Sequence, residues 1–314
     1  MSDPSVIEAA ATLLGARAER GVPLGPRTTY RVGGPASLFV TLEDDADVAA
    51  VAEAVRTTGV DVLVVGKGSN LLVADAGFPG LALALGDAFA SVEVSGTTVR
   101  AGGAAALPVV ARRTVAARLT GFEWAVGVPG SVGGAVRMNA GGHGSDLAAS
   151  LLRVRVVDLR TGEDGVVSAA ALHLGYRSST VAPSHLVVWA ELGLAPGDAT
   201  RGAEELADIV AWRRANQPGG PNAGSVFTNP PGDSAGRLID AAGGKGRRHG
   251  TASVSTKHAN FIQADDGGSA DDVRALMAEV QALVRAHAGV ELHPETRCVG
   301  FPDQGPNPRP GVEG

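Results

Sequence analysis

The sequence predicts a protein of the α+β class with more than one domain. Residues 37–66 read as strand, helix and strand, residues 151–195 alternate in the manner of antiparallel strands, and residues 216–288 mix short strands with helices. A chain of 314 residues is long enough for two or three packed domains. These three patterns place helices and strands in successive, differently built segments of one chain.

The first segment is expected to begin with a packing helix over residues 5–19, whose apolar positions recur at helical spacing. The strands predicted at 37–42 and 61–66 flank a helix at 45–59, which makes a βαβ unit. A Rossmann fold is disfavoured, because the glycine loop at 66–70 leads into another strand, at 71–75, and lacks the G-x-G-x-x-G pattern and its helix.

Strands are expected next at 81–85 and within 91–103, followed by a helix over 108–121, a glycine-dense stretch at 127–144 and hairpin-linked strands between 151 and 195. The later elements are predicted as helices at 201–215 and 235–243, a strand at 258–264 and a long helix at 269–288. The proline- and glycine-rich residues 303–314 have almost nothing to bury, which predicts a disordered tail.

Composition excludes several classes of function. The net charge of -6 provides no basic field for nucleic acid or an anionic membrane surface. A single cysteine, Cys298, and scattered histidines leave no disulfide and no metal-ligand spacing. No apolar run reaches the length of a membrane span, so we expect a cytoplasmic protein, and we expect it to act as a monomer.

Glycine is the compositional outlier, with 44 residues, about twice its usual share of roughly 7%. Two clusters, at 65–70 and 126–144, have the features of phosphate-binding loops, because glycine lets backbone N–H groups approach a diphosphate without side-chain obstruction. A plain tight turn is an equally good interpretation of the first cluster alone. The second cluster is too long and too rich in glycine for a plain turn.

The order of several motifs along the chain resembles that in UDP-N-acetylenolpyruvoylglucosamine reductases. The resemblance covers roughly residues 22–300, and its motifs are TTYRVGGPA (28–36), VGKGSNLLVAD (65–75), GVPGSVGGAVRMNAG (127–141), GYRSS (175–179), NAGSVFTNP (222–230), KHANF (257–261) and HPETRCVG (293–300). So many motifs in one order make a chance match implausible.

The resemblance implies an FAD-binding fold of the p-cresol methylhydroxylase and vanillyl-alcohol oxidase type, followed by a C-terminal α+β substrate domain. It implies one FAD-binding subdomain at 1–88, to which 296–302 return, a second at 89–200, and the substrate domain at 201–295. FAD would lie between the two glycine loops and NADPH would reduce it. The implied cofactor residues are Gly66, Lys67, Gly68, Ser69, Asn70, Gly127, Pro129, Gly130, Ser131, Gly134, Asn139 and Gly141.

Three motif positions carry the family's catalytic residues: Arg177 in GYRSS, Ser225 in NAGS and Glu295 in HPE. The chemistry suits them, because a hydride adding to the enolpyruvyl group of UDP-N-acetylglucosamine enolpyruvate pushes charge onto a carboxylate. Arg177 would hold that enolate, Glu295 with a raised pKa would hydrogen-bond its oxygen, and Ser225 would protonate C2. The product would be UDP-N-acetylmuramate, a peptidoglycan precursor for the bacterial cell wall.

We expect Tyr176, Asn229 and Lys257 to contact the sugar nucleotide, with Tyr176 also orienting the chain before Arg177. Two positions depart from the family pattern: Thr228 stands where a basic residue is common, and His143 where a tyrosine is common. The short spacing between Arg177 and Ser225 resembles the subclass that lacks the extra substrate-covering loop.

Two other functions fit parts of this pattern. One is an oxidase or dehydrogenase of the same fold with covalently attached FAD, although Cys298 lies outside the glycine loops and only His143 lies within them. The other is a flavin-binding interaction protein without catalysis, against which the presence of Arg177, Ser225 and Glu295 speaks.

Overall fold

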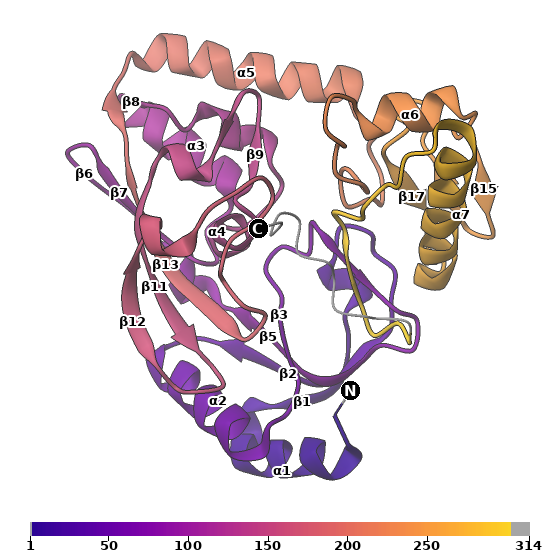
Figure 1. Cartoon of the computed structure of the whole chain (residues 1–314). Coiled ribbons are helices and arrows are strands. Elements are labelled where there is room, and N and C mark those ends of the chain that lie inside the picture. The colour runs from indigo at the N-terminus through magenta and orange to yellow at the C-terminus, as the bar shows by residue number, and fades with distance from the viewer. Residues whose placement is uncertain (1, 303–314) are drawn as a thin grey trace.

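The computed structural model describes residues 2–302, so the predicted tail at 303–314 lies outside the described residues. Three parts follow one another along the chain (Figure 1). Each contains its own small sheet with packed helices, and the fold is α+β as the sequence predicts.

The first part is a four-stranded sheet in the order β1-β2-β5-β3, with its helices at the bottom of Figure 1. The strands β2, β5 and β3 run parallel, and β5 lies between the two strands of the predicted βαβ unit. The elements are α1 (Pro4–Leu14), β1 (Glu19–Pro23), β2 (Pro35–Leu42), α2 (Asp45–Thr58), β3 (Val62–Val64), β4 (Leu71–Val73) and β5 (Phe78–Leu85).

The predicted helix at 5–19 is too long. Gly15 ends α1 with a φ of +54°, a conformation that glycine adopts at little cost, and a short 3₁₀ turn follows. Residues 19–23 then pair with β2 as an antiparallel edge strand. The loop after β3 does lead into a strand, β4, so the absence of a Rossmann crossover helix at this point is confirmed.

The second part is an antiparallel sheet in the order β12-β11-β13-β7-β6. The helices α3 and α4 pack on it and share its apolar core, which includes Leu107, Val110, Val132 and Val136. The elements are β6 (Val92–Ser95), β7 (Thr98–Gly102), α3 (Leu107–Ala116), β8 (Leu119–Thr120), α4 (Val132–Met138), β9 (Gly141–Gly142), β10 (Ser145–Asp146), β11 (Leu151–Asp158), β12 (Asp164–Ser168), β13 (His185–Gly193) and β14 (Ala195–Pro196).

The third part hangs from α5, which crosses the top of the molecule in Figure 1. It holds the sheet β15-β16-β17 and the long helix α7, and its last strand, β18, pairs in parallel with β4 of the first part. The elements are α5 (Ala199–Asn216), α6 (Ala235–Ala241), β15 (Arg248–His249), β16 (Ala252–Val254), β17 (Ile262–Ala264), α7 (Ala270–Ala288) and β18 (Arg297–Val299).

One predicted element in the second part and one in the third part are shorter than expected. The helix expected at 108–121 ends at Ala116, because residues 119–120 pair with β14. The strand expected at 258–264 begins only at Ile262, because residues 255–261 form a turn closed by a hydrogen bond from the amide of Ser255 to the carbonyl of Phe261.

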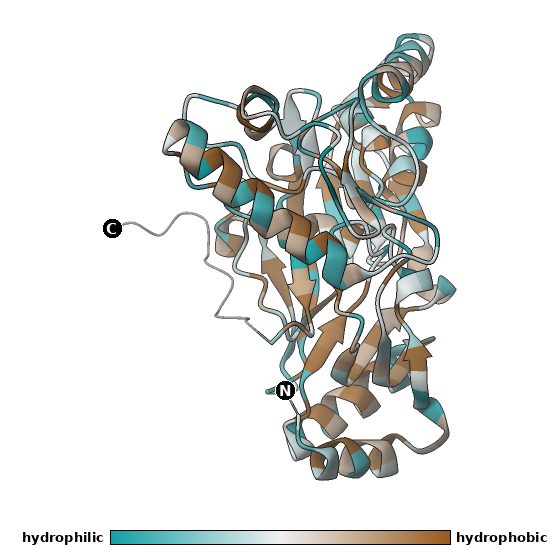
Figure 2. Ribbon diagram, turned by 90° about the vertical axis from the view of Figure 1, so that its right-hand side faces the viewer, coloured by the Kyte–Doolittle hydropathy of each residue, from teal (hydrophilic) through white to brown (hydrophobic). Residues whose placement is uncertain are grey.

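Short 3₁₀ helices complete the described structure: η1 (Gly15–Arg17), η2 (Gly25–Arg27), η3 (Asp87–Ala90), η4 (Glu123–Gly127), η5 (Leu147–Ala149) and η6 (Ala169–Leu172). Figure 2 shows the strands largely in the hydrophobic colour, whereas the helices alternate between hydrophobic and hydrophilic stripes. This is the pattern of sheets covered by amphipathic helices.

Asp75 joins the first part to the third. Its carboxylate accepts hydrogen bonds from the amides of Ala270 (2.9 Å) and Asp271 (3.3 Å) and from the hydroxyl of Ser269. The first N–H groups of α7 have no partner within the helix, so a side chain from a distant part of the chain satisfies them. The negative charge also lies at the favourable end of the helix dipole.

Replacing Asp75 with Ala should lower the free energy of unfolding by about 1–2 kcal/mol, the usual cost of losing a helix cap. Urea denaturation followed by circular dichroism measures the change. The matched control is Asp266→Ala, in the exposed turn just before α7. Equal midpoints for the two variants would contradict the capping role.

Candidate active site

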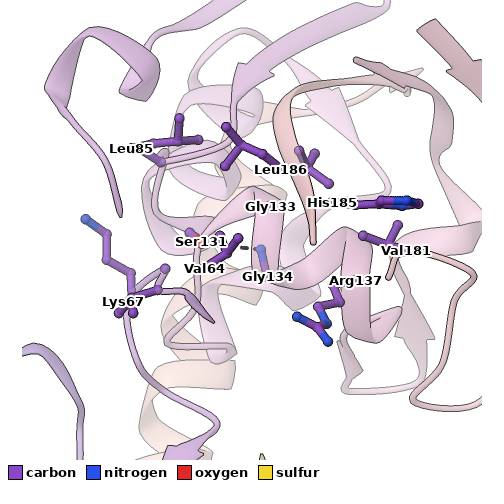
Figure 3. Close-up of a pocket in the computed structure, with 14 residues that line it drawn as sticks. Val64, Lys67, Leu85, Ser131, Gly133, Gly134, Arg137, Val181, His185 and Leu186 are labelled. Atoms are coloured by element: carbon purple, nitrogen blue, oxygen red, sulfur yellow. Dashed lines mark hydrogen bonds between the residues drawn. The ribbon is translucent and has the colours of Figure 1, made fainter. Parts of the chain in front are cut away.

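A cavity of about 590 Å³, counting the space open to solvent at its mouth, lies where the first and second parts meet. One wall comes from β3, the loop after it and the end of β5, and the other from α4 and β13. The lining residues are Val64, Val65, Gly66, Lys67, Leu85, Ala104, Ser131, Gly133, Gly134, Arg137, Val181, His185, Leu186 and Val187. Figure 3 shows Lys67 and Arg137 on either side of Ser131 and Gly134.

The two glycine loops press against each other at this cavity. A Cβ on Gly66 would lie 2.5 Å from the hydroxyl oxygen of Ser131, so a larger residue here would displace the Ser131 side chain. Gly68 has a φ of +61°, and a Cβ there would lie 2.3 Å from the carbonyl oxygen of Arg27. The space left for backbone amides, together with the apolar wall, fits a dinucleotide such as FAD.

Four of the predicted cofactor residues line the cavity, namely Gly66, Lys67, Ser131 and Gly134. Gly127 is buried under α5, where its carbonyl accepts a hydrogen bond from Arg213. The others are not among the lining residues: Gly68, Ser69, Asn70, Pro129, Gly130, Asn139 and Gly141. Their contacts with a cofactor stay predictions.

Asn139 organises the turn that carries Arg177. Its amide nitrogen donates to the carbonyl of Gly175 (2.9 Å) and to the carboxylate of Asp146 (3.1 Å), while its oxygen accepts from the amide of Ala148 (3.0 Å). Both amide hydrogens are therefore engaged within the protein. Asn139 also ends α4 in the left-handed conformation, which asparagine tolerates better than most residues.

Arg177 and Glu295 meet directly, although 118 residues separate them in the sequence. Nε of Arg177 lies 2.9 Å from Oε1 of Glu295, and Nη2 donates to the carbonyl of Gly141 at 2.9 Å. The two side chains are only 23% and 16% exposed. Arg177 has a φ of +53°, a backbone conformation that costs a residue with a Cβ about 1–3 kcal/mol and is typical of functional sites.

Burial raises the pKa of Glu295, and the charge of Arg177 and its hydrogen bonding oppose that rise. The net effect is a raised pKa, which is the direction expected from the sequence for a carboxyl group that donates a hydrogen bond. A carboxyl that is protonated more easily than in water can act as a donor toward an anionic ligand.

Ser225 lies beside this pair through the backbone. The carbonyl of Val226, the next residue, accepts the amide hydrogens of Glu295 (2.8 Å) and Thr296 (3.3 Å), and Phe227 forms a bridge with Pro294. Gly224, with a φ of +77°, turns the chain just before Ser225. The predicted catalytic residues therefore come together from the second and third parts of the fold.

The predicted substrate residues lie at the edge of this site. Tyr176 is 57% exposed, and the guanidinium of Arg177 lies 5.3 Å from the centre of its ring. The side-chain oxygen of Asn229 accepts from the amide of Ala235 at the start of α6, and the ammonium of Lys257 donates to the carbonyl of Arg214 at the end of α5. Their contacts with a sugar nucleotide stay predictions.

Two arginines that the sequence pattern does not single out also belong here. Arg137 lines the cavity, and Arg297 follows Glu295 by two residues. Burial lowers the pKa of both, and their mutual repulsion contributes for Arg137. The signal available in the sequence was the place of Arg297 in the motif HPETR, two residues after Glu295.

Within residues 2–302, no cluster of histidine, cysteine or acidic side chains is placed to hold a metal ion, and no helix in that range is both long and apolar enough to cross a membrane. Burial raises the pKa of the Cys298 thiol to about 11, which makes a reactive thiolate at this position unfavourable.

The raised pKa of Glu295 makes a prediction about stability. Because the folded protein holds the proton of Glu295 more tightly than the unfolded chain does, the protonated carboxyl favours folding. This stabilisation is fully present below the pKa of glutamate in the unfolded chain, about 4.3, and is lost as pH rises through the pKa in the folded protein. Glu295→Gln should therefore gain stability over the wild type with rising pH, by about 1.4 kcal/mol for each pH unit that separates the folded pKa from the unfolded one. Urea denaturation of the flavin-free protein near pH 4 and pH 8 tests this, with exposed Glu93→Gln on β6 as control. A difference that does not change with pH would contradict it.

Comparisons with known proteins agree with this geometry. Residues 36–164 match the model of an FAD binding domain, and residues 215–299 match the model of the C-terminal domain of UDP-N-acetylenolpyruvoylglucosamine reductase. The first match contains the cavity residues from Val64 to Arg137 but not those at 181–187, and the second match contains Ser225 and Glu295.

Full-length relatives are also similar. The UDP-N-acetylenolpyruvoylglucosamine reductase of Heliobacterium modesticaldum is 43% identical, covering 88% of this chain and 89% of its own, and that of Acidiphilium cryptum is 42% identical over 90% and 92%. The crystal structure of the reductase from Thermus caldophilus matches with a TM-score of 0.79 and 35% identity, over 90% of this chain and 99% of that one. The chain therefore belongs to the UDP-N-acetylenolpyruvoylglucosamine reductase family.

Proposed function

We propose that the chain is a flavin-dependent oxidoreductase that reduces UDP-N-acetylglucosamine enolpyruvate to UDP-N-acetylmuramate for peptidoglycan synthesis. The observation that carries the proposal is the partly buried pair of Arg177 and Glu295, which lies beside Ser225 and close to a cavity that fits FAD. Family membership supports the same reaction.

The arrangement of the parts supports a division of labour. We propose that residues 1–88 and 89–200 hold FAD between them, because the cavity takes its lining from both. Residues 201–295 would cover the substrate, because they contribute Ser225 and Glu295. When bound, FAD supplies the hydride that adds to C3 of the enolpyruvyl group.

Arg177 is suited to hold the carboxylate of the substrate. Its Nε faces Glu295 and its Nη2 is fixed by Gly141, while Nη1 has no partner among the described residues. A planar guanidinium that is already held on two sides loses little freedom on binding a carboxylate. The same positive charge stabilises the enolate that forms when negative charge moves toward that carboxylate.

Glu295 and Ser225 complete the proton chemistry. Protonated Glu295 donates a hydrogen bond to the enolic oxygen, which the raised pKa of its carboxyl group supports. The hydroxyl of Ser225 then gives its proton to C2, because a carbanion-like enolate in a dry site is basic enough to take it. The low exposure of Arg177 and Glu295 supports the exclusion of water.

We also propose that NADPH is the reductant, and that the protein covers its substrate without the extra loop found in other members of the family. A nucleotide sugar and NADPH are cytoplasmic metabolites, which supports a cytoplasmic location. The proposed role in peptidoglycan synthesis supports a role in cell shape and division. A monomeric state stays a prediction.

Anaerobic stopped-flow absorbance tests the function. The flavin-loaded protein is reduced with NADPH and then mixed with UDP-N-acetylglucosamine enolpyruvate. Rapid return of the oxidised flavin spectrum, with UDP-N-acetylmuramate formed, is the expected result. A flavin that stays reduced until oxygen is admitted would instead indicate an oxidase.

Ser225→Ala should leave flavin reduction by NADPH nearly unchanged and slow reoxidation by the substrate by at least about 100-fold, the lower range for loss of a general acid. The same stopped-flow experiment resolves the two half-reactions. Ser168→Ala, on the exposed end of β12, is the matched control. Equal slowing of both half-reactions would assign Ser225 a structural role.

A further inference from the structure

Arg137 and Arg297 form a partly buried pair of positive charges without a negative partner. Neither guanidinium makes an ion pair with an acidic side chain among residues 2–302, and burial lowers the pKa of both groups. For Arg137 the pKa falls to about 9, with repulsion by Arg297 as the second cause. Guanidinium groups are protonated in proteins at neutral pH, so the pair carries two positive charges.

Such a pair is expensive unless an anion joins it. Moving an ion out of water costs several kcal/mol even after the protein relaxes, and two like charges add their repulsion. Elsewhere in the chain, arginines such as Arg100, Arg153 and Arg155 have carboxylate partners. Arg137 and Arg297 lack such a partner although they are partly buried and lie close enough to repel each other, which points to a bound anion.

The position of the pair relates it to the reacting centre. Arg297 follows Glu295 by two residues, and its amide donates to the carbonyl of Asn70 in the first glycine loop (3.0 Å). The carbonyl of Arg137 accepts from the hydroxyl of Ser179, two residues after Arg177 (2.7 Å). Arg137 also lines the cavity, so the pair connects the cavity to the segments that carry Arg177 and Glu295.

A charge count shows what is missing. Arg137, Arg177 and Arg297 together bring three positive charges, and Glu295 offsets none of them in the protonated state that the proposed mechanism requires. The carboxylate of the substrate offsets one charge, at Arg177. Two positive charges, on Arg137 and Arg297, remain, and the two-electron reduced flavin ring would offset one of them, because it carries a negative charge along N1 and the C2 carbonyl.

We propose that Arg137 and Arg297 form the counterion of the reduced flavin ring, with the guanidinium groups facing its N1–C2=O edge. The proposal rests on the proposed function, because it takes FAD as the cofactor. Lys67, which lines the cavity from the first glycine loop, would instead pair with the diphosphate of FAD. The pair thereby stabilises the reduced cofactor until the substrate arrives.

Sodium sulfite is a probe of this charge that needs no turnover. The lone pair of its sulfur forms a bond to flavin N5, and the negative charge that results moves onto N1–C2=O, where the arginines would neutralise it. The experiment titrates the FAD-loaded wild type, Arg137→Gln, Arg297→Gln and Arg137→Lys with sulfite, and measures the midpoint potential by dye equilibration. Arg112→Gln, on the exposed face of α3, is the matched control.

Each glutamine variant should raise the sulfite Kd at least about tenfold and lower the midpoint potential by about 30 mV for each tenfold loss in stability of the reduced form. Arg137→Lys should keep most of the effect, since it keeps the charge. If Arg297→Gln does not fold, Arg137→Gln decides the question alone.

Unchanged sulfite affinity and potential in Arg137→Gln would overturn the proposal. A higher KM for the UDP-sugar with unaltered flavin properties would also overturn it and would assign the pair to the substrate. The sulfite titration and the potential measurement need only bound FAD. A wild-type protein that binds FAD but does not reduce the UDP-sugar would therefore disprove the proposed function alone. The sulfite affinities and potentials of the variants would still test the role of Arg137 and Arg297.

Discussion

The position of Glu295 depends on backbone hydrogen bonds on both of its sides. Its amide donates to the carbonyl of Val226 in the third part, and its carbonyl accepts from the side chain of Asn70 in the first glycine loop (3.0 Å). Two residues later β18 begins its parallel pairing with β4. The return of the chain to the first part is therefore the constraint that brings the cavity, the serine loop and the carboxyl group together.

The energetics of the site follow from this constraint. A carboxyl held between two parts of the fold loses water, which raises its pKa, and Arg177 limits that cost at 2.9 Å. Arg177 in turn occupies a strained backbone conformation, which the hydrogen bonds of Asn139 to the turn and of Gly141 to the guanidinium maintain. The burial of Glu295 and the backbone conformation of Arg177 therefore lower the stability of the fold, and they hold the two charged groups in position for an anionic substrate.

Much of the fold could be predicted from periodicity, and the failures have local causes. The helix and strands of the βαβ unit and the helix α7 lie where the apolar pattern places them, whereas α1 stops early because Gly15 adopts a positive φ. Periodicity has no means of pairing β4 with β18, since their contact joins residues more than two hundred positions apart.

The candidate site was predictable only through motifs that resemble a known family. Arg177, Ser225 and Glu295 were named on that basis, and the structure brings them together. Asn139 was expected to contact a cofactor, while its side chain is engaged with Gly175, Asp146 and Ala148. Arg137 and Arg297 were missed because an arginine in a sequence is most often solvated, and only the fold shows that these two are partly buried without acidic partners.

The cap that Asp75 places on α7 limits how far the C-terminal part can be treated as a portable module. A fragment that begins at α5 would lack both this carboxylate and the strand that β18 requires. Exchange of such a part between relatives by recombination would succeed only if the recipient supplied an equivalent acidic residue after its β4. Selection on this stretch of the first part is therefore coupled to the helix that it caps, and the two should be inherited as one unit.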